Sequence, residues 1–227
     1  MGDNYVDLFA TKGLEYILVI GFLITLVVFW RLLNRQGRPA ATRPARPSSV
    51  EWFTLVDNLY YHQGHSWARV EDGEVVAVGM DDFAQKLLGR PDALELPHVG
   101  SRLEQGAKGW TFRIGSISVN LLSPVDGQVS AVNEEVLKSP ELITTDPYGK
   151  GWLLKVKASK LNRDRKNLLS GELASAWMDQ TVDALRRRMS GNLGVVLQDG
   201  GMPVSGFVRN LSPDKWDEFA SEFLLSE

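Results

Sequence analysis

The longest apolar run in the chain lies near its N-terminus, where residues 14–33 read LEYILVIGFLITLVVFWRLL. Its only charges, Glu15 and Arg31, lie close to its two ends. At 1.5 Å per residue, a helix of this length spans about 30 Å, the thickness of a bilayer's hydrocarbon core. The pattern therefore predicts one transmembrane helix over 14–33, preceded by an extracytoplasmic segment over 1–13.

The charges that flank this run predict its orientation. One basic residue, Lys12, precedes it, and five arginines crowd its C-terminal end and flank: Arg31, Arg35, Arg38, Arg43 and Arg46. Basic flanks face the cytoplasm, and the acidic leader without a cleavage motif disfavours a signal peptide. We therefore expect a single-pass protein of the inner (cytoplasmic) membrane, in contact with the lipid bilayer, with its N-terminus outside and its globular domain in the cytoplasm.

After the apolar run the pattern changes twice. Residues 34–50 (NRQGRPAATRPARPSSV) have no apolar period, which predicts a flexible linker. Beyond them, short apolar runs alternate with turn residues, and a short helix over 81–89 ends at a glycine. The predicted strands cover 67–70, 75–78, 110–114, 118–122, 127–132 and 151–158. This pattern predicts a mainly β domain, a small barrel or sandwich over 51–161.

Residues 162–227 form a C-terminal extension whose apolar period is helical. One amphipathic helix is predicted over 171–191, and a second follows Ser212, a good N-cap. Trp216, Phe219 and Phe223 fall on one face of the second helix. This face must be buried, either on the chain's own barrel or in a groove of a partner subunit, for which these aromatic side chains are the candidate partner-binding residues.

Composition narrows the chemistry. The formal net charge is −3 and no extended basic block follows the linker, so nucleic acid is not an expected partner. The chain has no cysteine, which excludes disulfides, iron–sulfur clusters and cysteine nucleophiles. We expect no enzyme activity and therefore no catalytic residue, no metal ligands and no cofactor.

Two alternatives can be assembled from the histidines and serines. His62 and His65 are three residues apart, as in some metal sites, but no third ligand is evident. His65 and Asp126 could join Ser116 or Ser123 in a hydrolase triad, yet neither serine lies in a nucleophile elbow. Both alternatives are weak beside packing roles for these residues.

Six blocks of sequence carry a family resemblance. They are YHQGHSW (61–67), VGM followed by FAQKLLG, LPHVG (96–100), SPVDGQVSAVN (123–133), SPELI, and DPYGKGWLLKVKAS (146–159). In order and spacing they resemble the H protein of the glycine cleavage system. The resemblance implies a lipoyl-domain-like barrel-sandwich hybrid, in which a lipoyl arm on a lysine carries an aminomethyl group among three enzymes.

The chain departs from this family at one position. Counting back from Pro124, the family's lipoyl lysine falls at Ser116, and its usual acidic neighbour is replaced by Arg113. A serine hydroxyl cannot form the amide that lipoate attachment requires. We therefore expect no cofactor here, and a hairpin that meets partners through Arg113 and Ser116.

Together these inferences predict a non-catalytic, single-span accessory or scaffold subunit of a larger membrane electron-transfer complex, respiratory or photosynthetic. The other subunits of that complex would be its partners, and a degenerate H-protein-like domain would provide the docking surface. The alternatives are a lipoyl or aminomethyl carrier of the glycine cleavage type and a membrane adaptor protein.

Overall fold

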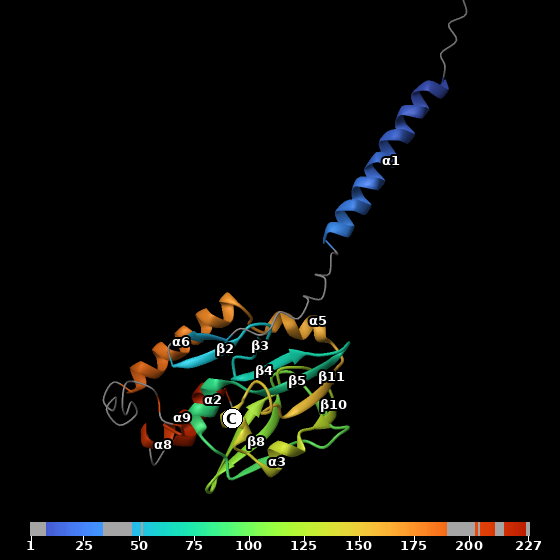
Figure 1. Ribbon diagram of the computed structural model, residues 1–227. Coiled ribbons are helices and arrows are strands. Elements are labelled where there is room, and N and C mark those ends of the chain that lie inside the picture. Colours follow the sequence, from blue (N-terminus) through green and yellow to red (C-terminus); the bar gives the residue numbers. More distant parts are fainter. Residues whose placement is uncertain are drawn as a thin grey trace, which may run out of the picture. The chain divides into compact units, whose positions relative to one another are not determined.

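The computed structural model describes residues 8–33, 47–50, 52–189, 203, 205–211 and 216–225 (Figure 1). The chain divides into two compact units, Met1–Pro44 and Ala45–Glu227, and each is described here by itself. Of the segment predicted over 1–13, residues 1–7 lie outside the described residues and the rest belong to a helix; of the linker predicted over 34–50, residues 34–46 lie outside them. Residues 47–50, assigned to that linker from sequence, form strand β1 (Pro47–Val50).

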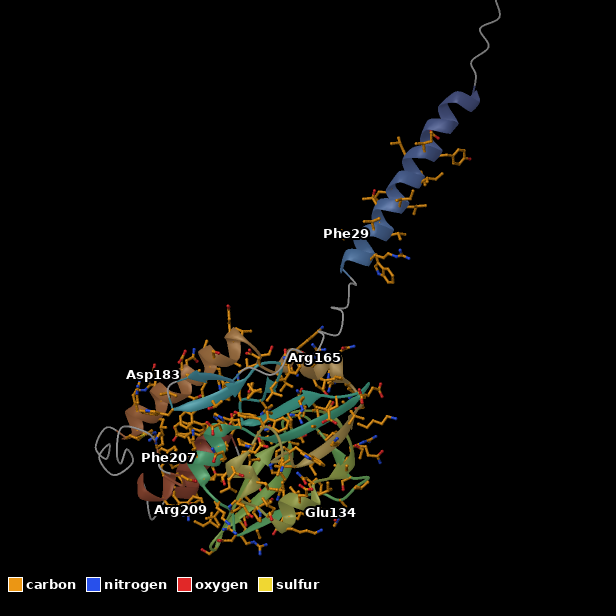
Figure 2. All side chains as sticks on the ribbon, viewed as in Figure 1. Phe29, Glu134, Arg165, Asp183, Phe207 and Arg209 are labelled. Carbon is orange, nitrogen blue, oxygen red and sulfur yellow. The ribbon has the colours of Figure 1, made fainter. Side chains whose placement is uncertain are left out.

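The first unit contains helix α1 (Leu8–Leu33). Its described apolar side chains, Phe29 among them, project from several sides of the helix and are exposed (Figure 2). In the described part of the chain, however, no helix combines the length and the apolar character that crossing a bilayer requires. Glu15 and Arg31 lie inside the predicted span, and the uncharged run between them is about 22 Å long, against the roughly 30 Å of a bilayer's hydrocarbon core.

The fold class predicted from sequence is therefore wrong in its transmembrane helix over 14–33. The single-pass localisation in the inner membrane and the lipid bilayer as a partner depended on that helix and are corrected with it. What the structure has is an N-terminal helix, sheets and C-terminal helices.

The second unit is built on three groups of paired strands. A hairpin joins β1 to β2 (Phe53–Val56), and a three-stranded sheet has the order β6-β8-β9. The six-stranded sheet has the order β3-β4-β5-β11-β10-β7. Its strands are β3 (Tyr60–Tyr61), β4 (Ser66–Val70), β5 (Val75–Met80), β11 (Leu154–Ala158), β10 (Gly127–Val132) and β7 (Arg102–Leu103). The smaller sheet contains β6 (Ala93–Glu95), β8 (Lys108–Ile114) and β9 (Ile117–Leu122).

The core of this unit is formed by side chains of these strands; burial alternates along β10, whereas β5 and β8 are buried over consecutive residues. Trp67, Val78, Leu121 and Val156 are all fully buried. Gly79 lies against the indole of Trp67, and a Cβ at this position would come within 2.6 Å of the ring, so a larger residue would not fit. The β pattern of the sequence therefore predicted the type of core, and the glycine makes room for its largest side chain.

Helix α2 (Asp82–Leu88) shows why the local sequence begins and ends a helix where it does. The Asp81 side chain accepts a hydrogen bond from the Ala84 backbone N–H at 2.9 Å, which caps the N-terminus. Gly89 ends the helix with a φ of 78°, which favours glycine. Two short helices lie between β10 and β11, α3 (Glu134–Lys138) and α4 (Leu142–Thr145); α5 (Leu161–Asp164) and the 3-10 turn η1 (Arg165–Asn167) follow β11.

The C-terminal extension packs on the barrel of its own chain. Helix α6 (Glu172–Met189) buries Met178, and α9 (Trp216–Leu224) contacts both β9 and α2. Between them in sequence, α8 (Val208–Leu211) also lies beside α2, where the Arg209 guanidinium donates to the Leu88 carbonyl at 3.3 Å (Figure 2). The proposed N-cap at Ser212 lies outside the described residues.

The aromatic face of α9 packs against the barrel and α2. Trp216 is 7% exposed, and the Phe223 ring lies 5.6 Å from the Phe83 ring of α2. Phe219 contacts Phe223 with ring centroids 5.2 Å apart, and both rings are half-buried. Of the two alternatives for this face, the structure contains packing on the chain's own barrel; a role in binding partners stays a prediction.

Candidate functional site at the β8–β9 hairpin

A tight turn joins β8 to β9 and presents Ser116. The register pairs Ile114 with Ile117, so Gly115 and Ser116 are the two residues of the turn. Gly115 has a φ of 60°, the left-handed conformation that two-residue hairpin turns need at their first position. Both turn residues are exposed. Ser116 therefore lies at the tip of the hairpin, accessible to another molecule.

Strand β6 and the residue before it hold this tip in place. The Gly115 N–H donates to the Asp92 carboxylate at 2.7 Å, and the Asp92 N–H donates to the Arg113 carbonyl at 2.8 Å. The Arg113 guanidinium in turn donates to the Glu95 carboxylate. The neighbour of Ser116 is therefore not a lone cation, because its charge is offset by Glu95 at the same edge of the sheet.

The residues of this tip do not fit a lipoyl group. Attachment needs an ε-amino group on a long stem, and Ser116 offers a hydroxyl on a single carbon. The nearest upstream lysine, Lys108, lies at the other end of β8, where it pairs with Leu122. The tip is thus an exposed two-residue turn without an amine that could hold a lipoyl arm.

The loop that follows β9 is fixed by a buried polar network. The Asp126 carboxylate accepts from the Gln105 N–H at 2.7 Å and pairs with Arg163. The Asp126 N–H donates to the Asp164 carboxylate at 2.9 Å. Asp164 is fully buried, and within the described residues its Oδ1 has no hydrogen-bond partner. This network ties the end of the hairpin to α5.

Asp164 gives a pH-dependent prediction. Burial raises its pKa above the ordinary value of 3.8, against the opposing hydrogen bond from Asp126. A raised carboxyl pKa means that its stabilising contribution is full below the unfolded value and is lost as pH rises through the folded value. The amide of Asp164→Asn does not titrate. We therefore expect the melting temperature of this variant, minus that of the natural protein, to increase as the pH is raised from 3 to 7, measured by thermal melting at each pH. Asp179→Asn, an exposed carboxylate of α6, controls for the loss of one charge; a difference that falls with pH would contradict the prediction.

A second polar arrangement, not foreseen from sequence, joins His65 to Asp81. His65 Nδ1 and Asp81 Oδ2 are 2.8 Å apart, and both side chains are buried. The two side chains therefore share a hydrogen bond in the core. His65 also has a φ of 62°, unusual for a residue with a side chain. The sequence offered two separate signals, the N-cap Asp81 and a turn that contains His65. They lie 16 residues apart, so their pairing can be recognised only from the fold.

The contacts of the histidines and of Ser123 bear on the two alternatives from sequence, a metal site and a hydrolase triad. The imidazole of His62 accepts from the Gly64 N–H at 3.0 Å, and burial lowers its pKa, with His65 nearby as a smaller cause. In the described ranges, no group of three His, Cys, Asp or Glu side chains could hold a metal ion. The triad is not assembled either, because His65 pairs with Asp81 and the Ser123 hydroxyl donates to the Val125 carbonyl at 2.9 Å.

Comparison with known proteins matches residues 59–181 to the family model described as "Glycine cleavage H-protein". The glycine cleavage system H protein of Carboxydothermus hydrogenoformans is 42% identical over 115 residues, 51% of this chain and 87% of that protein. The corresponding protein of Rubrobacter xylanophilus is 42% identical over 118 residues, 52% of this chain and 90% of that protein. A crystal structure of the H protein from Mycobacterium marinum is 28% identical, covers 56% of this chain and 99% of that one, and has a TM-score of 0.47.

These comparisons correct one expectation and leave another standing as a prediction. The matched family and the named relatives are glycine cleavage proteins, so the predicted assignment to electron transport or photosynthesis is wrong. The roles of Arg113, Ser116, Trp216, Phe219 and Phe223 in binding partners remain predictions. The matched region also continues past residue 161, the predicted boundary of the domain, into α6.

Proposed function

This chain belongs to the glycine cleavage H-protein family, and we propose that it acts as a non-enzymatic binding module of that family that carries no lipoyl arm. The observation that supports the proposal is Ser116 at the exposed tip of a carrier-type hairpin. The SPVDG loop of the family pattern follows this hairpin, whereas the attachment amine is replaced by a serine hydroxyl. Such a hairpin can still be recognised by its shape.

The partners that we propose are components of a glycine cleavage system, because the relatives carry that name. A protein that recognises this hairpin would meet Ser116 and the Arg113–Glu95 ion pair at the edge of the sheet. Because the arginine replaces an acidic residue of the family pattern, the surface differs in charge from that of a loaded carrier. Charge complementarity of this kind sets which partner binds.

A second candidate is a carrier of the glycine cleavage type, favoured by the family match over residues 59–181. It would require attachment at a residue other than Ser116. Lys108 is exposed at the start of β8 and is the lysine that this candidate would have to use.

Intact-mass measurement of the full chain, purified from its source organism, separates the two candidates. We expect the mass of the unmodified polypeptide, after correction for N-terminal processing. A mass increase of one lipoyl group would overturn the first proposal, and peptide mapping of that group to Lys108 would establish the second.

A binding measurement tests the first proposal directly. The full chain is immobilised, and the glycine cleavage proteins of the same organism are passed over it one at a time. We expect one of them to bind, and Ser116→Trp at the tip to weaken that binding at least tenfold, since bulk at the centre of an interface removes close packing. Ser130→Trp, on an exposed position of β10, is the matched control and should bind as the natural chain does. An unchanged affinity of the Ser116→Trp variant would refute the hairpin as the recognition surface.

A further inference from the structure

Apart from the hairpin, we propose that helix α1 pairs with α1 of a second copy of this chain, with the two helices antiparallel. The surface that would form this contact is a stripe of four β-branched side chains, here called the α1 seam: Ile17, Ile20, Ile24 and Val27. Their spacing of three, four and three residues is that of the inward positions of a coiled coil. The pairing involves the first unit alone and is independent of the proposed function.

The side chains of the α1 seam are exposed. Each of the four has between 53% and 68% of its surface accessible, and Figure 2 shows apolar side chains projecting along the length of the helix. The same residue types in the second unit, such as Ile143 and Val156, are fully buried. A contiguous apolar stripe gains free energy when another apolar surface covers it. The α1 seam therefore has the character of an interface.

The surface of α1 is hollowed along this seam. A groove of about 270 Å³ is lined by Ile20, Leu23, Ile24, Val27 and Val28. The first four of these residues occupy positions i, i+3, i+4 and i+7, which together form the hole that receives one side chain of a facing helix in knobs-into-holes packing. All five side chains are aliphatic and offer no hydrogen bond. The groove therefore fits a branched apolar side chain of another helix.

The residues that continue the seam at its two ends favour the antiparallel orientation. The same spacing leads to Gly13 before the seam and to Arg31 after it. In a parallel pair the two Arg31 side chains would face each other, and like charges repel. In an antiparallel pair with Ile20 opposite Ile24 of the second copy, Arg31 lies opposite Gly13. A Cβ at Gly13 would meet nothing within 4 Å, so the arginine has room there.

The charges at the two ends of α1 also favour a second copy as the partner. Glu15 lies near the N-terminal end of the helix, Arg31 lies near its C-terminal end, and both are exposed. An antiparallel pair places the acidic end of each copy beside the basic end of the other, and two-fold symmetry makes this contact twice. A second copy of α1 therefore supplies both the apolar side chains and the complementary charge.

Single cysteines test the register directly, because the chain has no cysteine of its own. Ile17→Cys and Val27→Cys are made in the full chain and kept in a mild detergent, which covers the apolar side chains outside the seam. We expect an oxidised mixture of the two variants to contain the disulfide between them, identified by its intact mass. Either variant alone should stay uncrosslinked, because its cysteine lies about 15 Å along the helix from that of the second copy, whereas a disulfide needs Cα atoms within about 7 Å. Disulfides within one variant alone, or none in the mixture, would overturn the antiparallel pair.

Sedimentation equilibrium of the natural chain in the same detergent provides a second measurement, with two copies per particle expected. Ile24→Glu should weaken the association about a hundredfold, because it buries a carboxylate against Ile20 of the second copy. Phe22→Glu is the matched control: it adds the same charge to the same helix, but helical spacing places Phe22 on the face opposite the seam, so this variant should associate as the natural chain does.

Three outcomes of the sedimentation measurement would overturn the pairing. They are a monomeric natural chain, a particle of more than two copies, and equal effects of Ile24→Glu and Phe22→Glu. If the monomeric chain then bound vesicles of neutral phospholipid, the seam would be a lipid-binding surface instead. Circular dichroism of each variant verifies that it is folded.

Discussion

Replacing Ser116 with lysine is expected to convert an unmodified chain into one that a lipoate ligase modifies. The substitution places an ε-amino group at the tip of a two-residue turn that is already exposed and already braced by Asp92. Nothing has to move to make room, since the side chain at this position points into solvent. The expected effect is large, from no lipoylated protein to a majority, because the missing amine is the one chemical requirement that the turn lacks.

The experiment is read by intact mass after incubation of Ser116→Lys with a lipoate ligase, ATP and lipoate, with a lipoylated relative as the positive control. Ser118→Lys is the matched negative control, since it puts a lysine on an exposed position of the same hairpin, two residues away from the tip. If Ser116→Lys stays unmodified while the relative is modified, the hairpin has lost more than its lysine. The variant Arg113→Glu combined with Ser116→Lys then shows whether the charge beside the tip is responsible.

The second large effect concerns stability, at Gly127 of strand β10. A Cβ at this position would lie 2.3 Å from the Lys157 carbonyl oxygen and 2.7 Å from Val156 Cγ1. Both atoms belong to β11, the neighbouring strand, so relief requires the two strands to separate. We expect Gly127→Ala to lower the free energy of unfolding by about 3 kcal/mol, the upper range for overpacking.

Chemical denaturation of the natural chain and of Gly127→Ala, followed by circular dichroism, measures this loss. Ser130→Ala on the same strand is the control, because it removes only an exposed hydroxyl and its hydrogen bond to the Lys155 carbonyl, which should cost no more than about 1 kcal/mol. A loss under about 1 kcal/mol for Gly127→Ala would mean that β10 and β11 separate more easily than their pairing implies.

The local elements of this fold could be predicted from sequence where a single residue determines a boundary. Asp81 and Gly89 predict both ends of α2, and the turn at Asp72 and Gly73 predicts the pairing of β4 with β5. Very short strands gave no such signal. Strand β7 has two residues and β6 has three, too few for an alternating pattern to be recognised.

The error over 14–33 has a different origin. The prediction rested on the length of the whole apolar run, with Glu15 and Arg31 interpreted as its two ends, and the described helix does not combine the length and apolar character of a span. The candidate site shows a further limit of sequence reasoning. The spacing to Pro124 was enough to select Ser116, which lies at the hairpin tip, whereas the contact of Phe83 with Phe223 joins residues 140 positions apart in sequence. Only the fold brings these two rings together.

The packing of α9 on β9 also has a consequence for how the protein is made. Helix α9 follows β9 by about 100 residues, which takes roughly 5 to 20 seconds of translation. During that interval the surface of β9 that α9 covers has no native partner, although the strands around it have already left the ribosome. The surface of β9 is therefore uncovered in the nascent chain until α9 has been synthesised. A chaperone that binds exposed apolar strands during translation would bind the chain at this surface.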